Sequence, residues 1–169
     1  MYYDRHALWL NVGFFVSQSI GYLREIPIEF PELHLAPDLD LKNLSGVVLI
    51  TRTPQGLLVQ VRLHATTPAE CGRCLAVFEQ PLEADFTDLY AFSKKSVTES
   101  GLILPETGVI DLAPVVREYM LLEIPINPLC SPDCKGLCPV CGERLDDRPH
   151  AHEDEPADPR IEQLKELLD

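Results

Sequence analysis

The residues of this chain best suited to chemistry are the cysteines and histidines between positions 129 and 152. Four of the six cysteines and two of the five histidines fall within this segment. Cys138 and Cys141 form a Cys-x-x-Cys turn, which can present two thiolates to one ion, and Gly142 lets the backbone curl back behind them. Zinc prefers four such ligands at tetrahedral angles. We therefore interpret residues 129–152 as a metal-binding segment.

Two close-set pairs could supply the remaining ligands for that turn. His150 and His152 are separated by one residue, so an extended segment can aim both at one ion. Cys130 and Cys134 form the other pair. The residue types alone leave both pairs open.

A second Cys-x-x-Cys motif lies at Cys71 and Cys74, between two segments that the residue pattern predicts as strands. A turn of this kind between strands is how zinc ribbons present half of a site. The alternatives are two inert buried thiols or a thioredoxin-like redox pair. A redox pair should open a helix within a βαβ unit, and the pattern shows no such unit here. The motif therefore favours zinc.

Composition and charge limit the classes of partner. The chain has 169 residues, 46% hydrophobic and 24% charged, which is typical of one globular domain with an appendage. Its net charge of −13 is the wrong sign for a protein that binds nucleic acid mainly through phosphates. Any contact with RNA must therefore be local or made through a protein partner.

The apolar run of residues 7–20 resembles a secretory signal only superficially. Polar residues interrupt it, Asp4 occupies the region that should be positive, and it is too short to span a bilayer. We expect an ordered N-terminal strand or amphipathic segment in a cytoplasmic protein. Cysteines in Cys-x-x-Cys groups then indicate metal ligation before disulfides.

The clearest β pattern is a hairpin. Residues 46–53 and 57–65 are rich in β-branched residues, and the turn of residues 53–56 contains Pro and Gly. The proline-rich residues 21–40 predict an extended edge segment and loop, and residues 78–92 predict another strand.

One central helix is predicted at residues 111–124. Asp111 would be its N-cap, a proline falls in the first turn, and Pro125 stops it. Its broad apolar stripe predicts packing across the sheet. A short terminal helix is predicted at residues 158–168, capped by Asp158, after an acidic run.

These elements predict an α+β fold: an antiparallel β-sheet domain with one packed helix and a C-terminal zinc-binding, cysteine-rich appendage. The expected division is a mainly β domain at 1–128, the cysteine- and histidine-rich segment at 129–152, and an acidic tail with a short helix at 153–169.

Several stretches together resemble the YceD family, the large ribosomal RNA subunit accumulation proteins of bacteria and plastids. The stretches that carry the resemblance are residues 70–75, 110–118, 122–130 and 133–142, with residues 11–12 and 158–160 near the ends. The resemblance implies a cytoplasmic, non-enzymatic factor needed for accumulation or processing of large-subunit ribosomal RNA. Its implied partners are pre-ribosomal RNA or ribosomal or processing proteins, with no membrane and no small-molecule substrate.

The resemblance also bears on which ligands share an ion. Some family members carry cysteines at the positions of the two histidines, and others lack residues 136–142 while keeping the first Cys-x-x-Cys. Segments that come and go separately imply two structural zinc sites. The ligands would be Cys138, Cys141, His150 and His152 in one site and Cys71, Cys74, Cys130 and Cys134 in the other.

Two single-site schemes stay open beside this one. The first is a ribbon formed by the two Cys-x-x-Cys motifs, and the second is a compact site using positions 130, 134, 138 and 141. In every scheme protein ligands fill all four positions, which indicates structural zinc, one or two ions, with no open position for a catalytic water.

The alternative function class is an enzyme, either a thiol oxidoreductase or a metal-dependent nuclease. The pattern shows no βαβ context for the first and no cluster of acids with a His at two-metal spacing for the second. Arg73, Lys135 and Arg144 lie beside cysteines and could contact RNA or a partner, although basic residues also settle near thiolates to balance charge. We favour charge balance and a protein that is not an enzyme.

Overall fold

A computed structural model of the chain describes residues 7–98, 100–146 and 152. Antiparallel β-sheet is their main regular structure, and a single longer helix packs onto it. The elements, in chain order, are β1 (Trp9–Asn11), α1 (Gly13–Val16), β2 (Leu23–Leu35), β3 (Leu39–Arg52), β4 (Gly56–Glu70), β5 (Val77–Ala91), the 3₁₀ turn η1 (Lys94–Ser96), β6 (Val109–Asp111) and α2 (Ala113–Glu123). The predicted antiparallel α+β character is confirmed.

The main sheet has the order β2-β3-β4-β5, so every strand pairs with its neighbours in the chain. Side chains alternate between the two faces of a strand, and the buried face of β4 is apolar from Leu57 to Ala65. Its buried residues are Leu57, Val59, Val61, Leu63 and Ala65. The predicted hairpin turn is confirmed, because the Thr53 hydroxyl and backbone N–H both donate to the carbonyl of Gly56, at 2.8 and 2.9 Å.

The proline-rich region forms more regular structure than expected. β2 pairs with β3 from Leu23 to Leu35, and the short turn that follows leads directly into β3. Pro27 and Pro31 are tolerated because β2 is an edge strand, where a missing N–H costs no ladder hydrogen bond on the open side.

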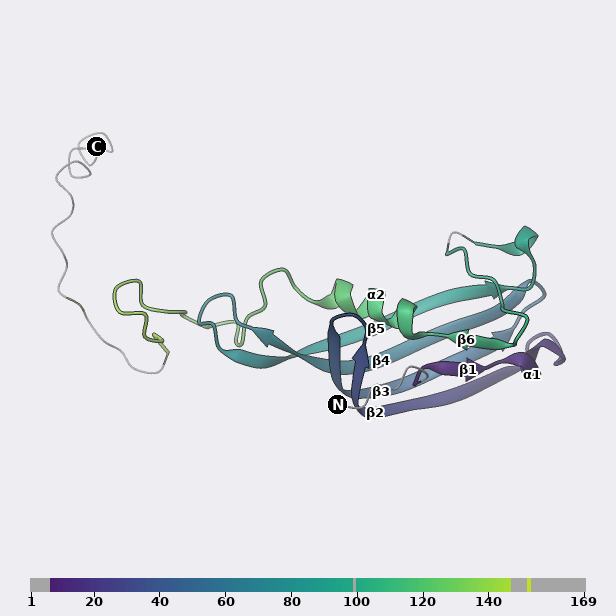
Figure 1. The fold of residues 1–169 in the computed structure, drawn as a ribbon, viewed down its shortest axis with the longest axis horizontal. Helices are drawn as coiled ribbons and strands as arrows, with labels where there is room; N and C mark the ends of the chain where they lie inside the picture. The colour runs from purple at the N-terminus through teal and green to yellow at the C-terminus, as the bar shows by residue number, and fades with distance from the viewer. Residues whose placement is uncertain (1–6, 99, 147–151, 153–169) are drawn as a thin grey trace, which may run out of the picture.

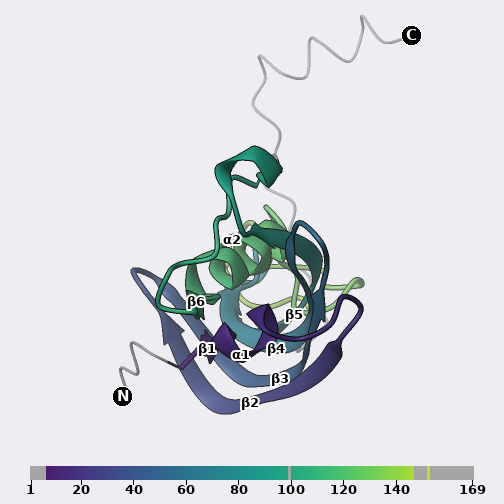
Figure 2. The ribbon, with the colours of Figure 1, turned by 90° about the vertical axis from the view of Figure 1, so that its right-hand side faces the viewer.

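Helix α2 packs on the concave face of the sheet (Figure 2). Val116 and Met120 are fully buried in the core, and the ring of Tyr119 stacks on Phe86 of β5 with centroids 4.2 Å apart. The predicted packing of this helix across the sheet is therefore confirmed.

The predicted start of the helix is two residues too early. Asp111 is the last residue of β6 and pairs with Trp9 of β1, so its backbone is extended. Its side chain still caps the helix start, because Oδ1 accepts the Ala113 N–H at 2.9 Å. No local sequence pattern indicates that residues 109–111 form a strand paired with β1.

The N-terminal segment is ordered, as expected. It forms β1 and the single-turn helix α1, and it buries Leu8, Val12 and Phe15 in the main core. None of the described helices has the length and apolar character needed to cross a membrane.

The predicted three-part division of the chain stays a prediction. In Figure 1 the segment after α2 lies beside the β4–β5 end of the sheet, at the opposite end from α1. The predicted helix at residues 158–168 and the acidic tail lie outside the described residues.

Candidate metal centre

The turn between β4 and β5 is a knuckle built around Cys71 and Cys74. The Cys71 N–H donates to the Ala76 carbonyl, and the Cys71 carbonyl accepts the Leu75 N–H, both at 2.9 Å. Leu75 takes a left-handed conformation, with φ of 58°. This tight return places both sulfur atoms on the same side of the turn.

The segment after helix α2 runs to the β4–β5 end of the sheet (Figure 1). It brings Cys130 and Cys134 to that knuckle. The carbonyl of Pro128 accepts the Gly72 N–H at 2.8 Å, and the Arg73 guanidinium donates to the carbonyl of Cys134 at 2.8 Å. These two hydrogen bonds fix the segment against the turn from both sides.

The four sulfur atoms form one compact group. Cys71 Sγ lies 3.8 Å from Cys134 Sγ, Cys74 Sγ lies 3.6 Å from Cys130 Sγ, and all four lie within 4.8 Å of one another. A tetrahedral ion with Zn–S bonds of about 2.3 Å holds its sulfurs about 3.8 Å apart. All four are free thiols, and three are buried. The spacing and the donor set therefore fit a closed, structural zinc site.

The thiols of this group differ in acidity. Backbone N–H groups of Cys130 and Cys74 stabilise the Cys71 thiolate and lower its pKa to about 6. Burial raises the pKa of Cys134 to about 12. The side-chain hydrogen bond between Cys130 and Cys74 favours the protonated Cys130 thiol and is the main cause of the raised pKa of Cys130. Four thiolates this close would need a cation to balance them, and a metal ion would supply that charge.

A second group lies further along the chain. Potential ligand atoms of Cys138, Cys141 and His152 fall within 4.8 Å of one another, and Cys138 Sγ lies 3.2 Å from His152 Nε2. His150, the predicted fourth ligand, lies outside the described residues. Three of the four ligands predicted for this site therefore lie close together in the structure.

The two Cys-x-x-Cys turns share one backbone pattern. The Cys138 N–H donates to Glu143 O at 2.8 Å, and Cys138 O accepts the Gly142 N–H at 2.9 Å, as in the first knuckle. Gly142 has φ of 75°, so it occupies the same left-handed position as Leu75. Gly142 was recognisable from the sequence, whereas Leu75 gave no signal because leucine seldom adopts this conformation.

The grouping corresponds to the two-site scheme. The structure brings the first Cys-x-x-Cys to Cys130 and Cys134 and the second to His152, whereas the two motifs do not share a group. Within the described part of the chain, these are the clusters of three or more Cys, His, Asp or Glu close enough to hold an ion. Ligation by the individual residues stays a prediction.

The three basic residues near the cysteines have structural contacts. Arg73 holds the Cys134 carbonyl, and Arg144 is bridged to Leu137 through the backbone. The backbone N–H of Lys135 donates to both carboxylate oxygens of Asp146, at 3.2 and 3.3 Å. The contact of Asp146 with Lys135 could not be predicted from the sequence, because no local pattern links positions 135 and 146. A role for these residues in contacting RNA or a partner stays a prediction.

A curved antiparallel sheet with a Cys₄ group at the end of its β4–β5 hairpin defines a β-sheet protein with candidate structural metal sites. The chain belongs to the YceD family, described as large ribosomal RNA subunit accumulation protein, whose family model matches residues 59–168. The match begins in β4 and includes every predicted metal ligand.

Individual relatives support the same membership. An uncharacterized protein of Mycobacterium tuberculosis is 35% identical over 137 residues, which are 78% of this chain and 61% of that protein. The uncharacterized protein YlbN of Bacillus subtilis is 30% identical over 100 residues, 58% of each chain. The chloroplastic YCED homolog 1 of Zea mays is 44% identical over 36 residues, 21% of this chain and 12% of the relative.

The aligned region thus spans about three-fifths of the length of the mycobacterial relatives. No solved structure is significantly similar to this chain.

Proposed function

We propose that this chain is a non-enzymatic, cytoplasmic factor that supports the accumulation or processing of large-subunit ribosomal RNA and ribosome assembly. The observation that carries the proposal is the match of the family model to residues 59–168. The family description names large ribosomal RNA subunit accumulation, and relatives in Zea mays and Arabidopsis thaliana bear the same name.

Two structural zinc ions are part of the proposal. The first would be held by Cys71, Cys74, Cys130 and Cys134, whose sulfur spacing supports tetrahedral coordination. The second would be held by Cys138, Cys141 and His152, with His150 as the fourth ligand. Four protein ligands leave a zinc ion no open position for a reacting water, so these ions would shape the fold and not catalyse a reaction.

The proposed ions would act by fixing the end of the long β4–β5 hairpin. The first group joins that hairpin end to the segment after α2, and the second knuckle follows within a few residues. A rigid end of this kind could present a constant surface to pre-ribosomal RNA or to a ribosomal or processing protein. We place the direct partner in one of these two classes.

Depletion of the protein, followed by sedimentation of ribosomal particles, tests this function. We expect fewer large subunits and less large-subunit ribosomal RNA, restored by the wild-type chain. The variant Cys130→Ser should restore less than the matched variant Ser131→Ala, which changes the neighbouring residue but removes no sulfur ligand. A normal level of large subunits after depletion would discard the proposal.

A further inference from the structure

The convex face of the main sheet carries apolar side chains that the core does not use. Val47, Leu49, Leu58 and Leu89 alternate with buried core residues, so they point to the opposite face. In the strand register Leu58 lies opposite Leu89, and Leu49 lies diagonal to Leu58, whose direct partner on β3 is Thr51. The polar Gln60 and Arg62 lie opposite Leu49 and Val47. All four are half-buried, which makes a contiguous apolar patch on an open sheet face.

The elements that cover the sheet lie on its other side. Figure 2 shows α2, β6 and β1 inside the curve of the sheet, where they pack on the core. Among the described residues no helix packs against the convex face. The loop that contains Thr98 and Ser100 reaches only its end, where these two residues line a hollow together with Leu58 and Leu89. Within the described part of the chain, no element therefore covers the apolar patch.

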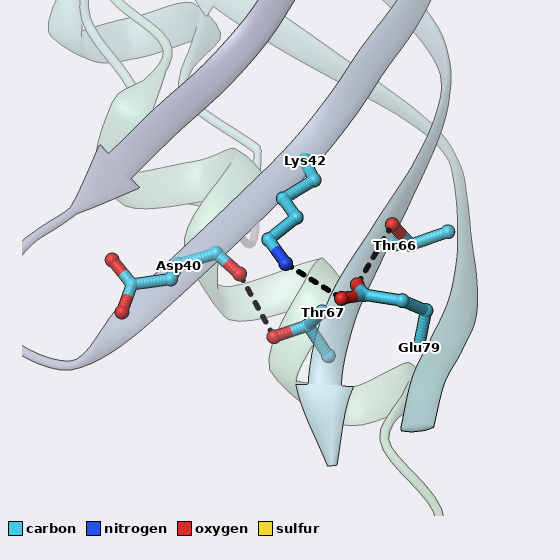
Figure 3. Close-up of polar contacts among 5 residues, drawn as sticks. All are labelled: Asp40, Lys42, Thr66, Thr67 and Glu79. Atoms are coloured by element: carbon cyan, nitrogen blue, oxygen red, sulfur yellow. Dashed lines mark hydrogen bonds and ion pairs between the residues drawn. The ribbon is translucent and has the colours of Figure 1, made fainter. Parts of the chain in front are cut away.

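The rim of this face is acidic. Basic side chains on the central strands are already paired with acids of β5: Arg62 with Asp85 at 3.3 Å and Lys42 with Glu79 at 2.6 Å. Figure 3 shows the second pair, in which Glu79 also accepts a hydrogen bond from Thr66.

The edge strand β2 adds carboxylates that have no such partner. Glu25 lies opposite Leu49 and Glu29 lies opposite Ser45, and neither of those neighbours is basic. Both glutamates are exposed, and neither makes an ion pair with another residue of the described ranges 7–98, 100–146 and 152. The face therefore carries uncompensated negative charge directly beside its apolar patch.

A pocket of about 220 Å³ lies at the end of the same face, where β2 turns into β3. Glu32, His34, Asp40 and Lys42 contribute polar groups to it, and Leu33, Leu41 and Pro68 contribute apolar walls. The Lys42 ammonium is already paired with Glu79, at 2.6 Å. His34 Nδ1 lies 2.6 Å from Asp40 Oδ1, which fixes the carboxylate in place. Apolar walls that lead to carboxylates match a lysine or arginine side chain, with its aliphatic stem and cationic end.

We propose that the convex face, from Leu49 and Glu29 to the pocket at Asp40, binds a protein segment rich in lysine and arginine with apolar residues between them. Charge complementarity selects this occupant. The exposed carboxylates repel RNA phosphates, and the chain's net charge of −13 opposes pairing with a second copy. Pro27 and Pro31 remove N–H donors from the edge of β2, so recognition uses side chains more than strand addition.

This proposal rests on the proposed function, because it specifies the chemistry of the protein partner. Its test uses only the purified full chain, so its result does not depend on whether the protein acts on ribosomal RNA. The probe is a synthetic peptide of alternating lysine and valine. Binding is measured by calorimetry, and its location is measured by amide chemical-shift changes. The double variant Glu25→Gln/Glu29→Gln should weaken binding about tenfold at low salt. The double variant Glu106→Gln/Glu123→Gln, with the same change in charge at exposed positions elsewhere, should change it less than about threefold.

A second pair of variants tests the apolar patch. Leu49→Ser should weaken peptide binding, whereas Leu122→Ser, at an exposed position on α2, should not. If the two double glutamate variants lost the same amount of peptide affinity, the effect would come from net charge alone, and the proposal would be overturned. Tighter binding of a single-stranded RNA oligonucleotide to this face, or dimerisation through it, would overturn it as well.

Discussion

The Sγ atoms of Cys74 and Cys130 lie 3.6 Å apart, although 56 residues separate the two cysteines in the chain. The distance is too long for a disulfide and close to the separation of two sulfurs on one tetrahedral ion, about 3.8 Å. The contact joins a turn of the sheet to the segment that follows its covering helix. A shared ion there would add to the hydrogen bonds that Gly72 and Arg73 already make between these two parts of the fold.

Elemental analysis of anaerobically purified protein should find about two zinc ions per chain. Cys74→Ser should remove the ion of the first group only, and Cys138→Ser that of the second only, because the two groups share no ligand. The double variant should bind none. About one ion in the wild type would contradict the two-site scheme, and a value near zero would refute the metal sites.

Loss of a ligand in the first group should destabilise the fold. We expect Cys134→Ser to lower the free energy of unfolding by at least about 3 kcal/mol, since a structural zinc contributes directly to folding. Denaturant unfolding with and without a chelator measures this. With the chelator present, the variant and the wild type should differ little. A difference that persists would assign the loss to the buried thiol itself.

The residue after each Cys-x-x-Cys pair should respond oppositely to substitution. Leu75 has positive φ and is 57% exposed, so Leu75→Gly should relieve about 1 kcal/mol of backbone strain. Gly142→Ala should cost about the same, because nothing lies within 4 Å of the added Cβ and only the backbone preference matters.

Gly136→Ala serves as the steric comparison for this pair of variants. Its Cβ would lie 3.0 Å from the Arg73 carbonyl, so it should cost more than Gly142→Ala. Thermal unfolding of the metal-loaded variants ranks the three. A destabilised Leu75→Gly would show that the leucine side chain matters more than its backbone.

Alkaline pH should destabilise the protein through Tyr90. Burial raises the pKa of Tyr90 to about 12, with Asp88 and Asp111 adding to the shift, whereas the unfolded chain has the ordinary value near 10. The folded state therefore binds the proton more tightly. The stabilisation is complete below about pH 10 and is lost as the pH rises to about 12, a total of about 2–3 kcal/mol.

The variant Tyr90→Phe isolates this contribution, because it cannot ionise. Its free energy of unfolding should fall less steeply between about pH 10 and 12 than that of the wild type. Denaturant unfolding over this range measures both slopes. Parallel slopes would exclude Tyr90 as the group responsible.

The sheet was largely predictable because its signals are local. The alternation in β4 and the turn before Gly56 define a hairpin without knowledge of the rest of the chain. β2 was predicted only in part, since Pro27 and Pro31 suggest a loop until the register with β3 is known. The pairing of β1 with β6 joins residues about a hundred positions apart and left no local trace.

The sequence was enough to predict which residues are candidate metal ligands, but not which of them lie together. Cysteine spacing identified all six cysteines as candidate ligands, yet the same spacing allowed three schemes. Only the fold brings Cys71 next to Cys134 and leaves Cys138 with His152. The open face around Leu49 was hidden for a similar reason, because a half-buried leucine in a strand resembles a core residue until the opposite face is known to hold the helix.

The order of strands in the sheet has a consequence for synthesis. Each strand pairs with its predecessor in the chain, so the hairpins can form one after another as the polypeptide leaves the ribosome. The thiols of Cys71 and Cys74 must then wait for residues 130 and 134, which emerge 56 and more positions later. The first group can therefore bind a metal ion with all four ligands only after the segment that follows α2 has been translated. Until then, the thiols of Cys71 and Cys74 in the nascent hairpin have no metal-binding partners.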